Sequence, residues 1–157
     1  MPVGVAALQD RSDFVRSQNA AKRSRQSGKQ RCVTAGLPPR IVTAIDESKI
    51  LGVRAGFRTD HHFTGVWPVV VKGRVFVRSW SLKPGGWYRT FLEDPRGTIS
   101  VGERQVRIRA VRVRSERIRA AVDAAYAAKY PTPGSRKYVV GFRTARRREA
   151  TMEFVPR

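Results

Sequence analysis

Residues 66–80, VWPVVVKGRVFVRSW, hold the pattern that decides the fold. Two runs rich in β-branched residues flank Lys72-Gly73, and this arrangement predicts an antiparallel β-hairpin in which Val71 lies opposite Arg74. One face of the hairpin then carries Val66, Pro68, Val70, Val75 and Val77, and the other carries Trp67, Val69, Phe76, Arg78 and Trp80. The first face is expected in the core, whereas the second combines aromatic rings with a guanidinium group.

The hairpin leads into a segment that could form an anion site. Residues 83–86 (KPGG) cannot continue a strand, while residues 87–94 read as a short helix that Pro95 stops. The first backbone N–H groups of such a helix lack intrahelical partners, so a phosphate or carboxylate could bind there, with Arg78, Lys83 and Arg89 adding positive charge. The alternative is a strand-to-helix loop with solvated basic residues and packed tryptophans.

The whole chain is strongly basic. It has 32 Lys and Arg against 12 Asp and Glu, a net charge of +20 and a pI near 11.6, which favours contacts with polyanions. A single cysteine, Cys32, excludes an internal disulfide and a thiolate cluster for zinc, so cytoplasmic residence is expected. We find no secretory signal and no stretch that approaches a membrane span, and therefore expect no membrane partner.

The rest of the chain predicts one domain behind a tail. Residues 1–40 lack an apolar pattern and are interpreted as a basic, disordered extension, and residues 41–157 as the folded domain. Within the domain we expect helices over 41–48 and 115–129, strands over 50–56, 98–101, 104–114, 138–143 and 150–155, and a loop over 59–65. In the strand 104–114 the period of two slips between Ala110 and Val111, which predicts a β-bulge. The predicted fold class is mainly β with two or three short helices (α+β), as a Greek-key antiparallel barrel of the split β-barrel type.

Catalytic side chains are scarce. There is no phosphate-binding P-loop, no G-x-G-x-x-G and no nucleophile elbow, and no metal site is expected because the adjacent His61 and His62 have no third ligand nearby. Asp123 is interpreted as the i,i+4 ion-pair partner of Arg119, and Tyr126 as a packed ring with its hydroxyl at the rim. An enzyme of this composition would need a cofactor, whose ring Trp67, Phe76 or Trp80 could stack against.

Several segments together resemble a family of small bacterial proteins known as a domain of unknown function. These segments are residues 66–80, GGWYRTFLEDPRGTISVG, VDAAYAAKY and the ending ATMEFVPR, and the resemblance covers roughly residues 41–157. More distantly, the order of hairpin, basic loop, "WY" helix, proline and strand is similar to deazaflavin-dependent nitroreductases and FMN-binding split β-barrel proteins. This similarity implies a barrel that is often a homodimer, with the cofactor ring near the subunit interface. Deazaflavin enzymes usually have Asn-Leu late in the helix, where this chain has Thr90-Phe91-Leu92.

The sequence thus predicts a flavin- or deazaflavin-dependent reductase whose substrate is unknown, with FMN or a deazaflavin as the cofactor. The predicted cofactor-binding residues are Trp67, Phe76, Arg78, Ser79, Trp80, Lys83, Gly85, Gly86, Trp87, Tyr88 and Arg89. Two alternatives remain open: a non-enzymatic module that binds nucleic acid weakly and without sequence preference, through Arg107, Arg109, Arg112 and Arg114, or a dimeric barrel scaffold without any cofactor.

Overall fold

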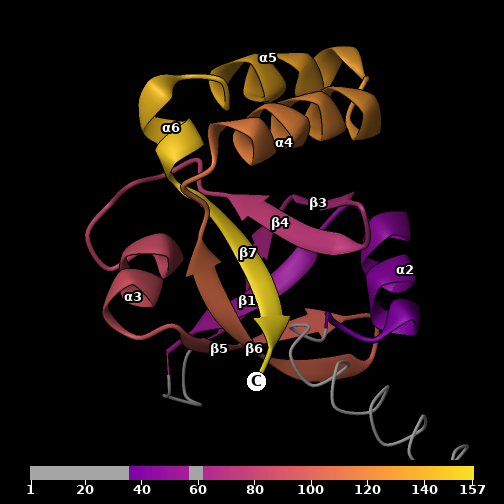
Figure 1. The fold of residues 1–157 in the computed structure, drawn as a ribbon, viewed down its shortest axis with the longest axis vertical. Helices are drawn as coiled ribbons and strands as arrows, with labels where there is room; N and C mark the ends of the chain where they lie inside the picture. The colour runs from indigo at the N-terminus through magenta and orange to yellow at the C-terminus, as the bar shows by residue number, and fades with distance from the viewer. Residues whose placement is uncertain (1–35, 57–61) are drawn as a thin grey trace, which may run out of the picture. The chain divides into compact units, whose positions relative to one another are not determined.

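The hairpin of residues 66–80 forms as expected in the computed structural model, which describes residues 36–56 and 62–157 (Figure 1). Val71 pairs with Arg74 and Val69 with Phe76. The turn residues Lys72 and Gly73 have φ values of 50° and 73°, as a tight turn that matches the twist of the strands requires. The elements of the described residues are α2 (Pro39–Glu47), β1 (Leu51–Ala55), β2 (Thr64–Val66), β3 (Pro68–Val71), β4 (Arg74–Arg78), α3 (Trp87–Glu93), β5 (Arg96–Val101), β6 (Arg104–Arg112), α4 (Glu116–Lys129), α5 (Pro133–Gly141), α6 (Ala145–Glu149) and β7 (Thr151–Pro156).

All seven strands form one antiparallel sheet in the order β2-β1-β5-β6-β7-β4-β3. The two edge strands, β2 and β3, are separated in the chain by Trp67 alone. Two residues of extended backbone span at most about 7 Å, so the edges of the sheet must meet at this point and the sheet must curl into a barrel. We call the junction at Trp67 the seam. The structure confirms the predicted class of α+β protein with a nearly closed antiparallel barrel.

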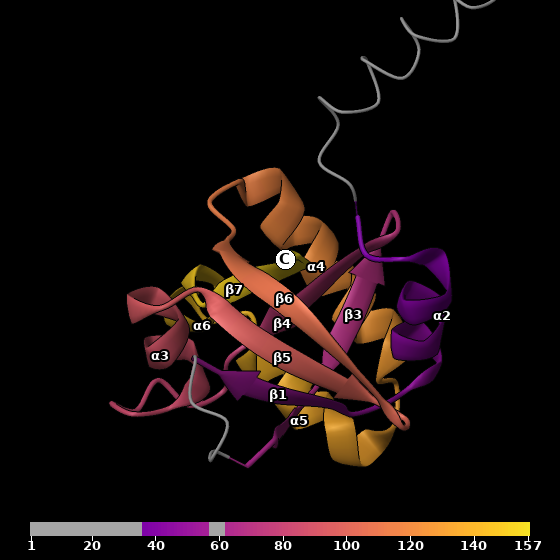
Figure 2. The same cartoon turned by 90° about the horizontal axis from the view of Figure 1, so that it is seen from below.

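The apolar side chains form two separate cores. The barrel core lies inside the sheet and includes Val75, Val77 and Ile108, together with residues of α2 and α3, which lie on opposite sides of the barrel (Figures 1 and 2). The outer core lies between the other face of the hairpin and the helices α4 and α5, and it includes Phe76 and Tyr126. The aromatic face of the hairpin is therefore largely covered by helices.

Several further expectations are confirmed. Helix α2 overlaps the predicted segment at 41–48 but begins two residues earlier, at Pro39, and β1 falls within 50–56. The second hairpin forms with Val101 opposite Arg104. Ser115 caps the N-terminus of α4, because its Oγ accepts a hydrogen bond from the backbone N–H of Ile118. The helix at 87–94 forms as α3.

Three local expectations are wrong. Residues 138–141 form the end of α5 rather than a strand, and Phe142 is its C-terminal cap. Pro133 occupies the first turn of this helix, and Val139 and Phe142 are buried in the outer core. Thr64 and Gly65 form β2 rather than a loop, whereas residues 59–61 lie outside the described residues. With α5 and α6, the described residues contain five helices instead of the two or three expected.

The predicted β-bulge near Ala110 is also absent from the described strand β6, which pairs continuously with β7. Ile108 and Ala110 point into the barrel core. Val111, on the opposite face, is 41% exposed, and Val113 is buried in the outer core. The change of parity in the sequence therefore marks a second core and not a slip in register.

The described residues pack as a unit that runs from Gly36 to Arg157. Leu37, just before α2, is buried in the barrel core. Residues 1–35 lie outside the described residues, so the predicted disordered extension stays a prediction. Among the helices of the described residues, none combines the length and apolarity that a membrane crossing requires.

Candidate functional site

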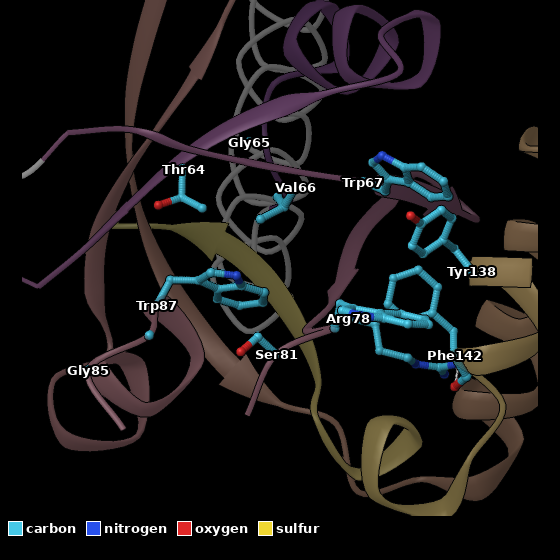
Figure 3. A pocket seen from close by; sticks show the side chains of 12 residues that line it. Thr64, Gly65, Val66, Trp67, Arg78, Ser81, Gly85, Trp87, Tyr138 and Phe142 are labelled. Carbon is cyan, nitrogen blue, oxygen red and sulfur yellow. Dashed lines mark hydrogen bonds between the residues drawn. The ribbon is translucent and has the colours of Figure 1, made fainter. Parts of the chain in front are cut away.

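A cavity of about 610 Å³ opens beside the seam. Its lining comes from β2 and the seam, the end of β4, the glycine loop before α3, and α5 with its end (Figure 3). The lining residues are Thr64, Gly65, Val66, Trp67, Arg78, Trp80, Ser81, Gly85, Gly86, Trp87, Tyr138 and Phe142. This volume lies in the range of small-molecule and cofactor sites.

One wall of the cavity is an aromatic cluster that packing holds in place. Trp67 stacks on Tyr130 with centroids 4.5 Å apart and meets Tyr138 edge-on at 5.7 Å. Trp80 meets Tyr138 at 5.0 Å and Phe142 at 5.6 Å, both edge to face. Figure 3 shows Trp87 on the other side of the cavity from Trp67, Tyr138 and Phe142. The cavity is thus bounded by aromatic rings on two sides.

The glycine loop forms the rim of the cavity near Trp87. Gly85 has a φ of 79°, which an L-residue with a side chain adopts only with strain. Gly86 precedes α3 and its N–H donates to the carbonyl of Lys83 at 3.1 Å, which closes the loop. The loop therefore presents backbone instead of side chains to the cavity at these two positions.

Arg78 borders the cavity, but its guanidinium group is directed into the protein. The side chain is fully buried, and it donates to Thr151 Oγ1 at 2.8 Å, to an Asp123 carboxylate oxygen, to the carbonyl of Phe142 at 3.0 Å and to that of Arg119 at 3.3 Å. The expectation that Arg78 lies outside the core is wrong. Its donors link β4, β7 and α4 to the end of α5, so it fixes Phe142 in the cavity wall.

Asp123 is the acidic partner of this network. Besides Arg78 it binds Arg148, whose Nε lies 2.9 Å from Asp123 Oδ2, and Arg148 also pairs with Glu116. The predicted pair of Asp123 with Arg119 does not form; Arg119 Nη1 lies 3.9 Å from Glu116, one turn away. Asp123 therefore holds α4, α6 and the barrel together.

Two buried tyrosines bind the backbone at the seam and next to it. The Tyr126 hydroxyl donates to the carbonyl of Trp67 at 2.7 Å and accepts from the N–H of Arg78 at 3.0 Å, so its predicted position at the rim is wrong. Burial raises the pKa of Tyr126 and of Tyr130 well above the usual value. The Tyr130 hydroxyl lies 3.0 Å from the carbonyl of Pro68. Lys129 Nζ also donates to that carbonyl, and burial lowers its pKa.

A second cleft, of about 700 Å³, lies next to the aromatic cavity and shares Trp80 and Ser81 with it. We call it the basic cleft, because its charged lining residues are Lys83, Arg146 and Arg147. Leu82, Thr144 and Ala145 complete its lining. No pattern in the sequence indicates that the loop at 80–83 and the α6 segment lie together.

The structure brings six of the eleven predicted cofactor-binding residues to the aromatic cavity, namely Trp67, Arg78, Trp80, Gly85, Gly86 and Trp87. Lys83 lines the basic cleft instead. Phe76 and Tyr88 are buried in the outer and barrel cores, and the buried Ser79 donates its Oγ to the carbonyl of Ser81. Arg89 is exposed, with Nε 3.4 Å from the carbonyl of Leu82. The assignment of these residues to a cofactor stays a prediction.

Tyr138 and Phe142 are cavity residues that sequence reasoning did not find. They are four residues apart, which places them on one side of a helix, but the run of residues 138–143 looks like a strand. Thr64, Gly65, Val66 and Ser81 were also missed.

The other chemical features lie apart from the cavity. His62 is exposed, and His61 lies outside the described residues. In residues 36–56 and 62–157 no cluster of His, Cys, Asp and Glu could hold a metal ion. Arg107, Arg109 and Arg112 of β6 and Arg114 just beyond it are all exposed. Because side chains alternate along a strand, the first two and the last two belong to different faces.

Comparison with known proteins places the chain in a family. Residues 40–154, more than half of the chain, match the family described as "Uncharacterized protein conserved in bacteria (DUF2255)", and the chain belongs to this family. This confirms the resemblance to a bacterial domain of unknown function, whereas the similarity to deazaflavin-dependent nitroreductases stays a prediction. Among curated proteins, none matches the sequence.

Among solved structures, the fold is similar to the crystal structure of conserved hypothetical protein Rv2991 from Mycobacterium tuberculosis. The TM-score is 0.51 at 13% sequence identity, and the match covers 78% of this chain and 81% of that chain. At this identity the likeness concerns the fold alone.

Proposed function

We propose that this member of the family binds the planar ring of a flavin or deazaflavin in the aromatic cavity and acts as a reductase through the bound cofactor. The observation that carries the proposal is the cavity itself, whose volume of about 610 Å³ is bounded by Trp87 on one side and the Trp67–Tyr138–Phe142 wall on the other. Flat rings gain dispersion and quadrupole energy between such walls. The glycine loop supports the proposal, because Gly85 and Gly86 let a ligand approach the backbone closely.

The cavity residues fit the ring of such a cofactor better than its phosphate. Arg78 is the one charged residue among the twelve that line the cavity, and its donors are engaged by Asp123, Thr151 and two carbonyl groups. We therefore assign Arg78 to holding the wall and not to binding phosphate.

When bound, a flavin or deazaflavin supplies two-electron hydride chemistry. The chain's own residues bind the ring by stacking, set its orientation and keep water from one of its faces. Because the cavity lining contains no carboxylate, histidine or lysine, we assign no proton-transfer role to it. The substrate would approach from the open side of the cavity, where Trp80 and Tyr138 are 40% and 37% exposed. A homodimer remains part of the proposal, and sedimentation velocity tests it.

The experiment is the absorption spectrum of the purified protein, followed by titration with FMN, riboflavin and a deazaflavin while tryptophan fluorescence is recorded. All three tryptophans of the chain line the cavity, so ring binding should quench most of the emission. Trp87→Leu should weaken ring binding about two- to tenfold, as the loss of one aromatic contact implies. Leu92→Ala is the matched control on the same helix, since Leu92 is exposed and does not line the cavity. If none of the three ligands binds, the proposal is wrong.

Nucleic-acid binding is the second candidate, and the observation that favours it is the exposure of four arginines on and just after β6, namely Arg107, Arg109, Arg112 and Arg114. The logarithm of the affinity for nucleic acid should fall linearly with the logarithm of salt concentration, and binding should show no sequence preference. Substituting Arg107 and Arg109 together by glutamine should then reduce the salt slope by about two units.

A further inference from the structure

We propose that the basic cleft is an anion subsite, which binds the phosphate-bearing side chain of the same ligand whose ring enters the aromatic cavity. This inference rests on the proposed function, because it extends that site from a ring pocket to a ring-plus-phosphate site. The ligand class is a planar ring with a phosphorylated side chain. FMN, with a terminal phosphomonoester, and a deazaflavin with a phosphodiester share this chemistry.

The aromatic cavity and the basic cleft are neighbours that share two lining residues. Trp80 and Ser81 line both, so the backbone at 80–81 is the common border between the aromatic cavity and the basic cleft. The proposal places the ligand across this border, with its ring in the cavity and its side chain running past Ser81 into the basic cleft. Aromatic rings line the cavity on one side of this border, and cationic side chains line the cleft on the other side.

The border is held rigidly. Trp80 packs so closely on Gly141 that a Cβ there would lie 2.4 Å from the Trp80 ring. Arg147 covers the ring with its guanidinium carbon 3.8 Å from the centroid, and it donates to the carbonyls of Trp80 at 3.0 Å and of Gly141 at 3.2 Å. Trp80 is thus fixed between α5 and α6. Arg147 acts as a positioning residue, because its donors bind the backbone of both neighbours.

Lys83 and Arg146 are the charges left for a ligand. Within the described residues, neither the Lys83 ammonium group nor the Arg146 guanidinium group has a hydrogen-bond or ion-pair partner, and the cleft lining contains no carboxylate to neutralise them. Other exposed arginines, such as Arg136, also lack partners, so an unpaired cation alone does not mark a site. Here two such cations border one cleft that shares Trp80 and Ser81 with an aromatic cavity.

The two cations suit a phosphate. A guanidinium group presents a planar fork that can bind two phosphate oxygens, and an ammonium group adds a compact charge on a flexible stem. The hydroxyl of Thr144 also lies in the lining. A phosphomonoester carries more charge than a single carboxylate and offers three acceptor oxygens, so it can engage both cations at once.

The test compares FMN with riboflavin, which differ only in the phosphate. At constant ionic strength, the wild-type protein should bind FMN about tenfold more tightly than riboflavin, as one charge-assisted contact to a solvated anion implies. Arg146→Gln and Lys83→Gln should each remove most of this preference and leave riboflavin binding unchanged. Arg136→Gln is the matched control, because it removes one exposed charge from the neighbouring helix α5 without touching either hollow. Thermal melts confirm that each variant is folded.

The outcomes separate this inference from the proposed function. If FMN and riboflavin bind equally in the wild type, or if Arg136→Gln reduces the preference as much as Arg146→Gln, the subsite is refuted while the ring site stands. If neither ligand binds, the ring site is refuted. The subsite is then tested by titrating the protein with inorganic pyrophosphate and following the NMR signals of the arginine and tryptophan side chains. Shifts at Trp80 and Arg146 that disappear in Arg146→Gln, but not in Arg136→Gln, support the anion site. If such shifts are absent, the anion subsite is refuted.

Discussion

Replacing Arg78 by methionine should destabilise the protein far more than an ordinary loss of an ion pair. The substitution keeps most of the volume of the buried stem but removes the guanidinium group, which makes four hydrogen bonds inside the protein. Among the described residues, the Asp123 carboxylate then keeps Arg148 as its one cationic partner, and the carbonyls of Phe142 and Arg119 lose a donor. Removing one member of a buried ion pair costs roughly 3–5 kcal/mol.

We expect the lower end of that range, about 3 kcal/mol, because the Asp123 side chain is 15% exposed and water can reach it. In urea unfolding followed by circular dichroism, with a slope of about 2 kcal/mol per molar, this corresponds to a midpoint lowered by about 1.5 M. Arg74→Met is the matched control, since it breaks the pair with Glu153 at a side chain that is 46% exposed. That loss should stay below about 1 kcal/mol.

The reasoning can be refuted in two ways. A loss below about 1 kcal/mol for Arg78→Met would mean that the buried network contributes no more than a surface pair. The double variant Arg78→Met with Asp123→Leu should recover part of the loss, because it removes the uncompensated carboxylate. If the double variant is as unstable as the sum of the two single variants, the two side chains are not coupled.

Two further outcomes follow from the structure. Gly97→Ala should lower the free energy of unfolding by more than about 2 kcal/mol in the same urea assay, because the new Cβ would lie 2.6 Å from the Phe91 ring and 2.8 Å from the carbonyl of Arg54. Gly134→Ala is the control, and it should be neutral or slightly stabilising because its Cβ would have nothing within 4 Å. The buried hydroxyls of Tyr126 and Tyr130 have raised pKa values in the folded protein. The unfolded chain therefore releases these protons first, and stability should fall as the pH rises above about 10. Ultraviolet titration checks this: tyrosinate absorbance that reached its full value while the fold persisted would contradict it.

The sequence patterns predicted correctly those elements that neighbouring residues determine. The turn at Lys72-Gly73, the cap at Ser115 and the helix stopped before Pro95 each depend on residues within a few positions of one another. The barrel class followed in the same way, from many short strands joined by tight turns. These features need no knowledge of distant partners.

Expectations failed where a distant partner decides the outcome. Asp123 has Arg119 on its own helix, yet it pairs with Arg78, 45 residues away, since burial of both makes that pair stronger than a solvated one. The segment 138–143 has β-branched residues, but its place over the outer core favours the helix. The sequence also gave no sign of the outer core, which covers the hairpin face that we expected to be open to a ligand. The basic cleft could not be foreseen for the same reason, because it joins segments more than 60 residues apart.

The position of β7 has a consequence for synthesis of the protein. This strand follows every other described strand in the chain, yet it lies in the interior of the sheet, between β6 and β4. At about 5–20 residues per second, the ribosome needs roughly 4–16 s after β4 before β7 exists. Until then β4, and β6 once Arg112 has been added, each present an unpaired edge that other nascent chains can join. We therefore expect the growing chain to depend on chaperones or on low concentration until β7 emerges, and we expect chains cut short before residue 151 to aggregate instead of folding in part.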